Sequence, residues 1–181
     1  NQAALESRQA VELLRMCLDA GYDRAQTLTA VNGMMLLAGQ GERFTTVDLF
    51  LLDLWTGKAS LDKLGAAGSY LMQAEGLSLL GGDALPLGIL ENVESGEKLM
   101  QLHQGDTLIL LSDGVEDAYE NRQAMEETIR DALTLETAQD AANAILTGAQ
   151  SGDTAPADDQ TVLVLRLIRA RADAKIEEMY Q

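Results

Sequence analysis

The sequence has few of the residue types on which several kinds of site depend. It contains one cysteine, Cys17, and one histidine, His103, among 181 residues. This set excludes an internal disulfide, a cysteine-based zinc site and a pair of histidine ligands. Prolines number 2, and aromatic residues make up 4%. No apolar stretch approaches the roughly 20 residues of a membrane-spanning helix, so we expect this segment neither to cross a bilayer nor to contact it directly.

Positive charge is also scarce. Lys and Arg total 13 against 29 Asp and Glu, which gives a formal net charge of -16. Such a domain repels nucleic acids and anionic lipids at long range, so nucleic acid is not expected as a partner. The acidity suits a domain that collects divalent cations or basic partners, and it equally suits a surface that only keeps the protein in solution. Hydrophobic residues make up 46%, which excludes wholesale disorder.

Two helices are predicted at the start of the chain. Apolar residues recur at helical spacing up to Gly21, which ends the first helix, and again over residues 24–37. The positions expected to face the core are Leu5, Val11, Leu14 and Leu18 in the first helix and Leu28, Val31 and Met35 in the second. Cys17 lies in an apolar part of the first helix and is expected in the core.

A run of strands follows the two helices, and one more strand comes near the end. The expected strands cover residues 44–54, 59–64, 69–73, 77–80, 98–103, 107–111 and 161–168. Two further helices, over about 123–132 and 138–149, precede the last strand, and residues 151–157 form a polar loop. Strands and helices do not alternate, so the order predicts an α+β fold in which helices cover antiparallel sheet, with no boundary that divides it into two domains.

The first candidate site is Ser112-Asp113-Gly114, directly after the wholly apolar strand 107–111. A carboxylate at the end of a buried strand has a fixed backbone, and the glycine allows a sharp turn. Asp113 is therefore well placed to hold a hard cation or to act as a base. Because Asp-Gly is also a common turn dipeptide, a purely structural turn is the alternative.

The second candidate site is Asp158-Asp159, directly before the last strand. Adjacent carboxylates repel each other, and a divalent cation would compensate that repulsion. The alternative is a solvated loop beside a strand. Two acidic sites that flank two different central strands could converge on one point, and ligands that offer only oxygen select Mg²⁺, Mn²⁺ or Ca²⁺ over zinc.

Other mechanisms find no support in the sequence. The phosphate-binding pattern G-x-x-x-x-G-K-[ST] is absent. His103 is expected at a solvent-facing position and not in a catalytic triad. Asp113 resembles a phosphoaspartate nucleophile, but the second acid expected two residues later is replaced by Val115.

Four stretches in order carry a resemblance to a known family. They are TTVDLFLLDLWTGKASLDKLGAAGSYL, LPLGIL, GDTLILLSDGVEDA and DDQTVLVLRL, preceded by AVNGMMLL in the second helix. Together they resemble the metal-dependent (PPM-type) protein serine/threonine phosphatases of bacteria, and within them the stage II sporulation protein E group most of all. The resemblance covers residues 1 to about 168.

The resemblance implies a fold of two packed antiparallel β-sheets flanked by helices. It also implies hydrolysis of phosphoserine or phosphothreonine by water that is activated between two metal ions, Mn²⁺ or Mg²⁺. The metal-binding Asp of the family's S-D-G motif falls on Asp113. The Asp of its D-N/D motif falls on Asp158, with Asp159 at the position that often holds Asn, so the expected metal ligands are Asp113 and Asp158.

One motif of the family is missing. An earlier D-G-M-G type motif, whose Asp bridges both metals, is expected just before the first helix, where this chain begins. Residues 1–168 are therefore expected to be the C-terminal part of a phosphatase domain, incomplete at its N-terminus, and residues 169–181 a C-terminal tail with helical character. On this expectation the chain alone has little or no phosphatase activity, binds metal weakly, and forms a homodimer to cover exposed sheet edges.

The resemblance further implies a partner and a location. The substrate would be a phosphorylated anti-sigma factor antagonist protein, which connects the domain with sigma factor regulation in sporulation. The domain would be cytoplasmic, as part of a membrane-anchored protein. Two alternatives are a catalytically inactive regulatory or protein-binding module and a plain α+β scaffold whose acidic residues only form turns.

Overall fold

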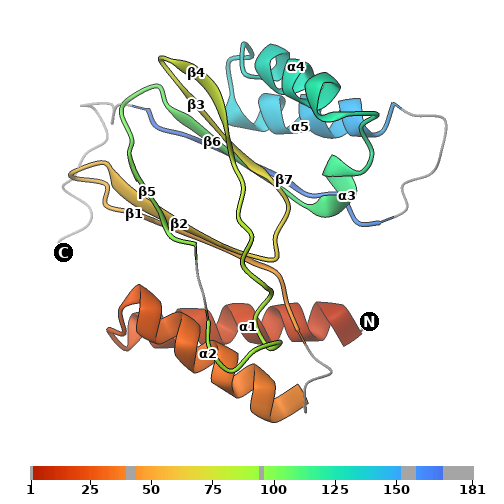
Figure 1. Cartoon of the computed structure of the whole chain (residues 1–181). Helices are drawn as coiled ribbons and strands as arrows, with labels where there is room; N and C mark the ends of the chain where they lie inside the picture. Colours follow the sequence, from red (N-terminus) through yellow and green to blue (C-terminus); the bar gives the residue numbers. More distant parts are fainter. Residues whose placement is uncertain (1, 40–43, 94–95, 152–157, 169–181) are drawn as a thin grey trace, which may run out of the picture. The chain divides into compact units, whose positions relative to one another are not determined.

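The computed structural model describes residues 2–39, 44–93, 96–151 and 158–168. The helices are α1 (Gln2–Asp19), α2 (Arg24–Gly39), α3 (Asp113–Glu116), α4 (Arg122–Ala132) and α5 (Ala138–Ala149). The strands are β1 (Val47–Leu52), β2 (Lys58–Leu64), β3 (Ser69–Gln73), β4 (Gly76–Leu80), β5 (Lys98–Gln101), β6 (Thr107–Leu111) and β7 (Val162–Arg166) (Figure 1). None of the described helices is long and apolar enough to cross a membrane.

The elements form two compact units whose segments interleave along the sequence. One unit comprises Asn1–Gly68 and Leu80–Met100, and the other comprises Ser69–Leu79 and Gln101–Gln181. No single boundary in the sequence therefore separates them. Each unit contains antiparallel strand pairs and two longer helices, so the predicted α+β class with two antiparallel sheets and flanking helices is confirmed.

The first unit is built from the helix pair α1–α2 and a three-stranded sheet in the order β1-β2-β5. Strands β1 and β2 form an antiparallel hairpin whose register runs from Val47 opposite Leu64 to Leu52 opposite Ala59. Period-two alternation directs one set of strand side chains toward the helices. The core of this unit consists of Ala10, Leu14, Cys17, Leu28, Val31, Met35, Leu49, Leu64 and Leu87.

The buried face of α1 differs from the predicted one. Leu5 and Val11 are 56% and 62% exposed, whereas the smaller Ala10 and Cys17 are buried. Ala10, Leu14 and Cys17 follow each other at helical spacing and form the buried face of α1. Of these three, Leu14 is the large residue that was predicted to face the core. The predicted inward residues of α2 and the burial of Cys17 are confirmed.

The first unit also buries charge. Asp62, which is 0% exposed, accepts a hydrogen bond from the guanidinium of Arg24 at the start of α2. The same guanidinium donates to Glu97 at 3.0 Å. Lys63 is 1% exposed, and its Nζ lies 2.7 and 2.8 Å from the two carboxylate oxygens of Asp48, its partner across the β1–β2 pair. Pairing of this kind makes buried charges tolerable in a core.

The second unit is a four-stranded antiparallel sheet in the order β4-β3-β6-β7, covered by α4 and α5 (Figure 1). The apolar strand β6 lies between β3 and β7, as expected of a central strand. In the described part of the chain β7 forms the sheet's edge, although it was predicted as a central strand. The core contains Tyr70, Ile109, Leu111, Val115, Met125, Ile129, Ala132, Ala141, Ile145 and Ala149.

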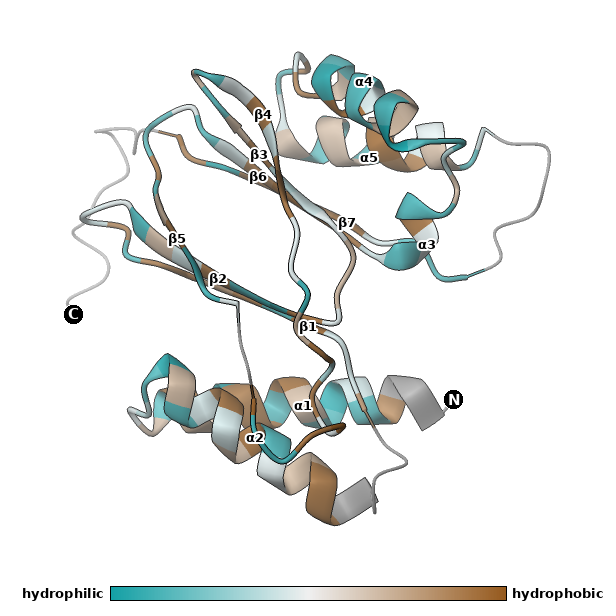
Figure 2. Cartoon of the chain, viewed as in Figure 1, coloured by the Kyte–Doolittle hydropathy of each residue, from teal (hydrophilic) through white to brown (hydrophobic). Residues whose placement is uncertain are grey.

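Side-chain caps fix where α4 and α5 begin. The Asn121 side chain accepts the N–H of Ala124 at 3.0 Å, and Thr137 Oγ1 accepts the N–H of Asp140 at 3.0 Å. Each bond satisfies an amide that has no partner within the helix. Helix α4 then buries Met125 and Ile129, one turn apart, while most of its visible surface is hydrophilic (Figure 2).

The predicted elements are present, with shorter ends for several strands. Strand 44–54 is reduced to β1, strand 98–103 to β5 and strand 161–168 to β7. The short helix α3 was not predicted, since a sharp turn was expected after β6. The polar loop predicted at 151–157 lies, apart from Ser151, outside the described residues, as does the tail predicted at 169–181.

Candidate metal centre

Asp113 lies at the point where β6 gives way to α3. It is the first residue of that helix, and its side chain is exposed. The residues around it are more buried, since Ser112 is half-buried and Gly114 and Val115 are buried. Val115 belongs to the core of the second unit. The backbone that carries the carboxylate is therefore anchored on both sides while the carboxylate faces solvent.

The segment with Asp158 and Asp159 adjoins the Asp113 segment. Strands β6 and β7 are antiparallel with Leu111 opposite Val162, so the end of one strand meets the beginning of the other. Beyond that pair the N–H of Ser112 donates to the carbonyl of Thr161 at 3.0 Å, and the N–H of Thr161 donates to Ser112 Oγ at 2.9 Å. We call residues 112–114 together with 158–161 the acidic junction.

Two further side-chain bonds cross the acidic junction. Ser112 Oγ donates to the carbonyl of Asp159 at 3.2 Å, and Gln160 Nε2 donates to the carbonyl of Gly114 at 3.0 Å. A Cβ at position 114 would lie 2.6 Å from the carbonyl oxygen of Asp159. Gly114 does not have a positive φ. Its role is therefore close approach of two backbones, and not the sharp turn that the sequence suggested.

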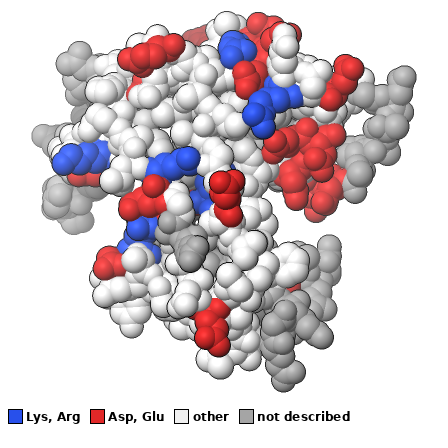
Figure 3. All heavy atoms as spheres, in the orientation of Figure 1, with Lys and Arg blue, Asp and Glu red and all other residues white. Residues whose placement is uncertain are grey.

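The carboxylates of the acidic junction fit a hard cation in chemistry. Asp113 Oδ1 accepts the N–H of Gly114 at 2.9 Å, and Asp158 Oδ1 accepts the N–H of Asp159 at 2.7 Å. These local bonds orient the two carboxylates and leave the second oxygen of each available as a ligand. Figure 3 shows acidic side chains gathered around α3 and the segment before β7. Oxygen donors of this kind suit Mg²⁺ or Mn²⁺.

The described residues do not complete such a centre. Among them there is no group of three or more His, Cys, Asp and Glu side chains placed to hold a metal ion. Asp113 and Asp158 stay predicted ligands, and a third acidic ligand is not found in the described part of the chain. Asp159 contributes its backbone carbonyl to the contacts with Ser112 and Gly114, and its side chain is exposed.

A buried phenol lies in the core of the second unit, which also contains Val115 of α3. Tyr70 is 1% exposed, and its hydroxyl has no hydrogen-bond partner among the described residues. Burial raises the pKa of the Tyr70 phenol, and the negative charges of Glu126 and Glu116 raise it further. This phenol therefore stays protonated at neutral pH in the folded protein.

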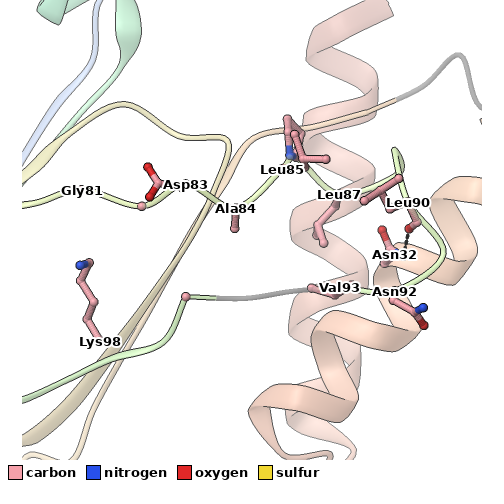
Figure 4. A pocket seen from close by; sticks show the side chains of 13 residues that line it. Asn32, Gly81, Asp83, Ala84, Leu85, Leu87, Leu90, Asn92, Val93 and Lys98 are labelled. Atoms are coloured by element: carbon pink, nitrogen blue, oxygen red, sulfur yellow. Dashed lines mark hydrogen bonds between the residues drawn. The ribbon is translucent and has the colours of Figure 1, made fainter.

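The pocket of about 680 Å³ in the first unit is a separate feature. It is lined by residues of α2, of the segment that follows β4 and of β5, among them Asn32, Asp83, Leu87, Asn92 and Lys98 (Figure 4). Asn32 is 2% exposed and holds one wall in place. Its Nδ2 donates to the carbonyl of Leu90 at 2.8 Å, and its Oδ1 accepts the N–H of Gly88 at 2.8 Å.

His103 has the solvent-facing position that the sequence predicted. His103 is exposed beyond the end of β5, with its Nδ1 3.8 Å from Asp106. Sequence reasoning missed the part that Ser112 and Gln160 play in joining the two acidic segments. A hydroxyl directly before Asp113 and an amide directly after Asp159 were the available signals, but their partners are 47 and 46 residues away.

Comparisons with known proteins agree with the fold. The sequence model of the family described as Stage II sporulation protein E (SpoIIE) matches residues 1–168. Stage II sporulation protein E of Priestia megaterium is 29% identical over 114 residues, which are 63% of this chain and 20% of that protein. The chain thus spans a small part of the curated relatives that it matches.

Solved structures of phosphatase domains are also similar. The PP2C phosphatase domain of SpoIIE from Bacillus subtilis, solved with a fragment of its regulatory domain, superimposes with a TM-score of 0.78 at 26% identity, over 90% of this chain and 50% of that one. The catalytic domain of the serine/threonine protein phosphatase PstP, in complex with two manganese ions, gives a TM-score of 0.70 at 20% identity, over 90% of this chain and 82% of that one. The chain belongs to the Stage II sporulation protein E family and has the fold of a PP2C-type protein serine/threonine phosphatase domain.

Proposed function

We propose that this chain is a metal-dependent protein serine/threonine phosphatase domain that hydrolyses phosphoserine or phosphothreonine on a protein. The observation that carries the proposal is the acidic junction, where Asp113 and Asp158 lie on two segments joined by hydrogen bonds. Membership of the SpoIIE family supports it. The cofactor we propose is Mn²⁺ or Mg²⁺, with two ions in the intact domain.

The chain's own residues would serve to hold and orient the ions. Asp113 and Asp158 would each offer the carboxylate oxygen that its neighbouring amide does not occupy. Bound divalent metal supplies Lewis acidity and lowers the pKa of a coordinated water. The acidic junction and residues 115–120 contain no Lys or Arg, so these segments offer a phosphate group no positive side chain. The attraction for a phosphoprotein would therefore have to come from the ions.

We extend the proposal to the partner and the setting. The substrate would be a phosphorylated anti-sigma factor antagonist, as the resemblance to sporulation-type phosphatases implies, and the domain would be the cytoplasmic part of a membrane-anchored protein. A homodimer is also proposed. Analytical ultracentrifugation tests it, because a clean monomer at high protein concentration would contradict it.

Metal titration with matched variants tests the ligands. With two carboxylates from the described residues, we expect weak Mn²⁺ binding by the 181-residue chain and slow Mn²⁺-dependent hydrolysis of a phosphoserine protein. Asp113→Asn should abolish both. Asp117→Asn removes another exposed acid, directly after the same short helix, and serves as the control. Equal losses in both variants would attribute the binding to general acidity and contradict the proposal.

A second candidate is a regulatory or protein-binding module without turnover. It is favoured by one observation, that the described residues bring together no third acidic ligand. Such a module would bind its phosphorylated partner equally with and without Mn²⁺ and release no phosphate. Release of phosphate that stops on addition of EDTA would exclude it.

A further inference from the structure

We infer that Gln160 is a positioning residue for the metal-binding carboxylates and that it acts through the backbone of Gly114. The inference rests on the proposed function, because it takes Asp113 and Asp158 as ligands. The connection runs through the backbone next to Asp113, because Gln160 Nε2 donates to the carbonyl of Gly114.

The argument begins with the way Asp113 is bracketed. On one side, Ser112 Oγ bonds to the carbonyl of Asp159 and the N–H of Thr161. On the other side, the carbonyl of Gly114 accepts a hydrogen bond from the side-chain amide of Gln160. Both neighbours of Asp113 are thus fixed to the segment that carries Asp158. Since the Asp113 side chain is itself exposed, these backbone anchors limit where its carboxylate can lie relative to Asp158.

Stability alone does not explain a glutamine at this position. Its Nε2 is satisfied by Gly114, but its Oε1 is buried and has no hydrogen-bond partner among the described residues. A buried carbonyl oxygen without a partner is unfavourable by about as much as one good hydrogen bond contributes. A methionine of similar volume removes this unpaired oxygen, but it also leaves the carbonyl of Gly114 without its donor. Because these two changes act in opposite directions, we expect Gln160→Met to change stability little.

The positioning role predicts a different outcome for the metal. Without the bond to Gly114, the Asp113 backbone keeps only the anchors of Ser112, and the two carboxylates are less well pre-organised for one ion. The loss of one hydrogen bond of this kind corresponds to roughly a threefold to tenfold weaker affinity. Gln160→Met should therefore separate metal affinity from stability.

The experiment is a Mn²⁺ titration of the isotope-labelled 181-residue chain, followed by paramagnetic broadening of its backbone amide resonances. Broadening at residues 112–117 and 158–161 reports binding at the acidic junction even where affinity is weak. The variants are Gln160→Met, Ser112→Ala and, as the matched control, Gln150→Met, which replaces an exposed glutamine at the end of α5. The Tm of each variant is measured without metal.

We expect Gln160→Met to bind Mn²⁺ roughly threefold to tenfold more weakly with a Tm within about 2 °C of the wild type, and Gln150→Met to match the wild type in both. Ser112→Ala should also weaken binding and speed exchange of the Thr161 amide, which loses its acceptor.

Wild-type affinity in Gln160→Met would overturn the inference and leave the proposed function standing. So would a large loss of Tm in that variant, which indicates a structural role. Absence of broadening at the acidic junction of the wild type would instead overturn the proposed function, and the inference with it.

Discussion

Replacement of Gly114 by alanine tests whether the acidic junction depends on close approach of its two backbones. The added Cβ would lie 2.6 Å from the carbonyl oxygen of Asp159 and 3.2 and 3.3 Å from the carbonyl carbons of Asp159 and Asp158. All three atoms belong to the backbone, so no side-chain rotation relieves the overlap. The segment 158–161 has to move away from α3, which strains the bonds of Ser112 and Gln160 that hold it.

The expected magnitude follows from the cost of overpacking. An extra methyl group against well-packed atoms destabilises a protein by about 1–3 kcal/mol, which for a chain of this size lowers the Tm by roughly 2–12 °C. Binding of Mn²⁺ at the acidic junction should weaken together with stability, because the same movement separates Asp113 from Asp158. Differential scanning calorimetry measures the first effect and the Mn²⁺ titration the second.

Gly33 provides the matched control. It lies inside α2, and a Cβ built there has no neighbouring atom within 4 Å. Gly33→Ala should stabilise the protein by about 0.5–1 kcal/mol, because alanine is the better helix former, and raise the Tm by roughly 1–4 °C. A Gly114→Ala protein as stable as the wild type, with unchanged Mn²⁺ binding, would refute the close-approach argument.

Three further predictions concern polar side chains of the two units. Tyr70→Phe removes a buried hydroxyl that has no hydrogen-bond partner among the described residues, so the variant should be as stable as the wild type or more stable. Because the pKa of Tyr70 is raised in the folded protein, the wild type should lose stability as pH rises above about 10, and the variant should lose less in urea unfolding titrations. Arg24→Met leaves the buried Asp62 carboxylate without its guanidinium and should cost about 3–5 kcal/mol, whereas Arg24→Met combined with Asp62→Leu should recover most of the loss. Arg166 donates to the carbonyls of residues 133, 135 and 136, so Arg166→Met should cost about 1–3 kcal/mol and Arg166→Lys less, and equal Tm values for the two variants would contradict this role.

The sequence predicted the elements well where its pattern was strong. The mostly apolar run of β6 and the capped helices α4 and α5 have nearly the predicted bounds, because burial and local capping both act within a few residues. It failed on the buried face of α1. There the apolar residues lie on several faces of the helix, and only packing against the rest of the first unit selects the line of Ala10, Leu14 and Cys17.

The buried ion pairs could not be predicted from the sequence. The buried Asp62 and Lys63 and the half-buried Asp48 are charged residues within strands, a pattern that usually indicates an exposed face. Their burial depends on partners that the fold brings together, since Arg24 is 38 residues from Asp62 and Asp48 is 15 residues from Lys63. A charge is tolerated in the core only when such a partner is present, and no local pattern reports it.

For the candidate metal centre, the order of residues alone indicates which carboxylates are available and that each adjoins a strand. Asp113 follows β6 and Asp158 precedes β7, and both facts are visible in the order of residues. That the two segments meet is visible in the fold alone. The antiparallel pairing of β6 with β7 places Leu111 opposite Val162, so residues 45 or more positions apart become neighbours, and Ser112, Gly114 and Gln160 then join them. Strand pairing is a non-local choice, set by which apolar faces bury each other, and for that reason the acidic junction belongs to the fold and not to any single stretch of sequence.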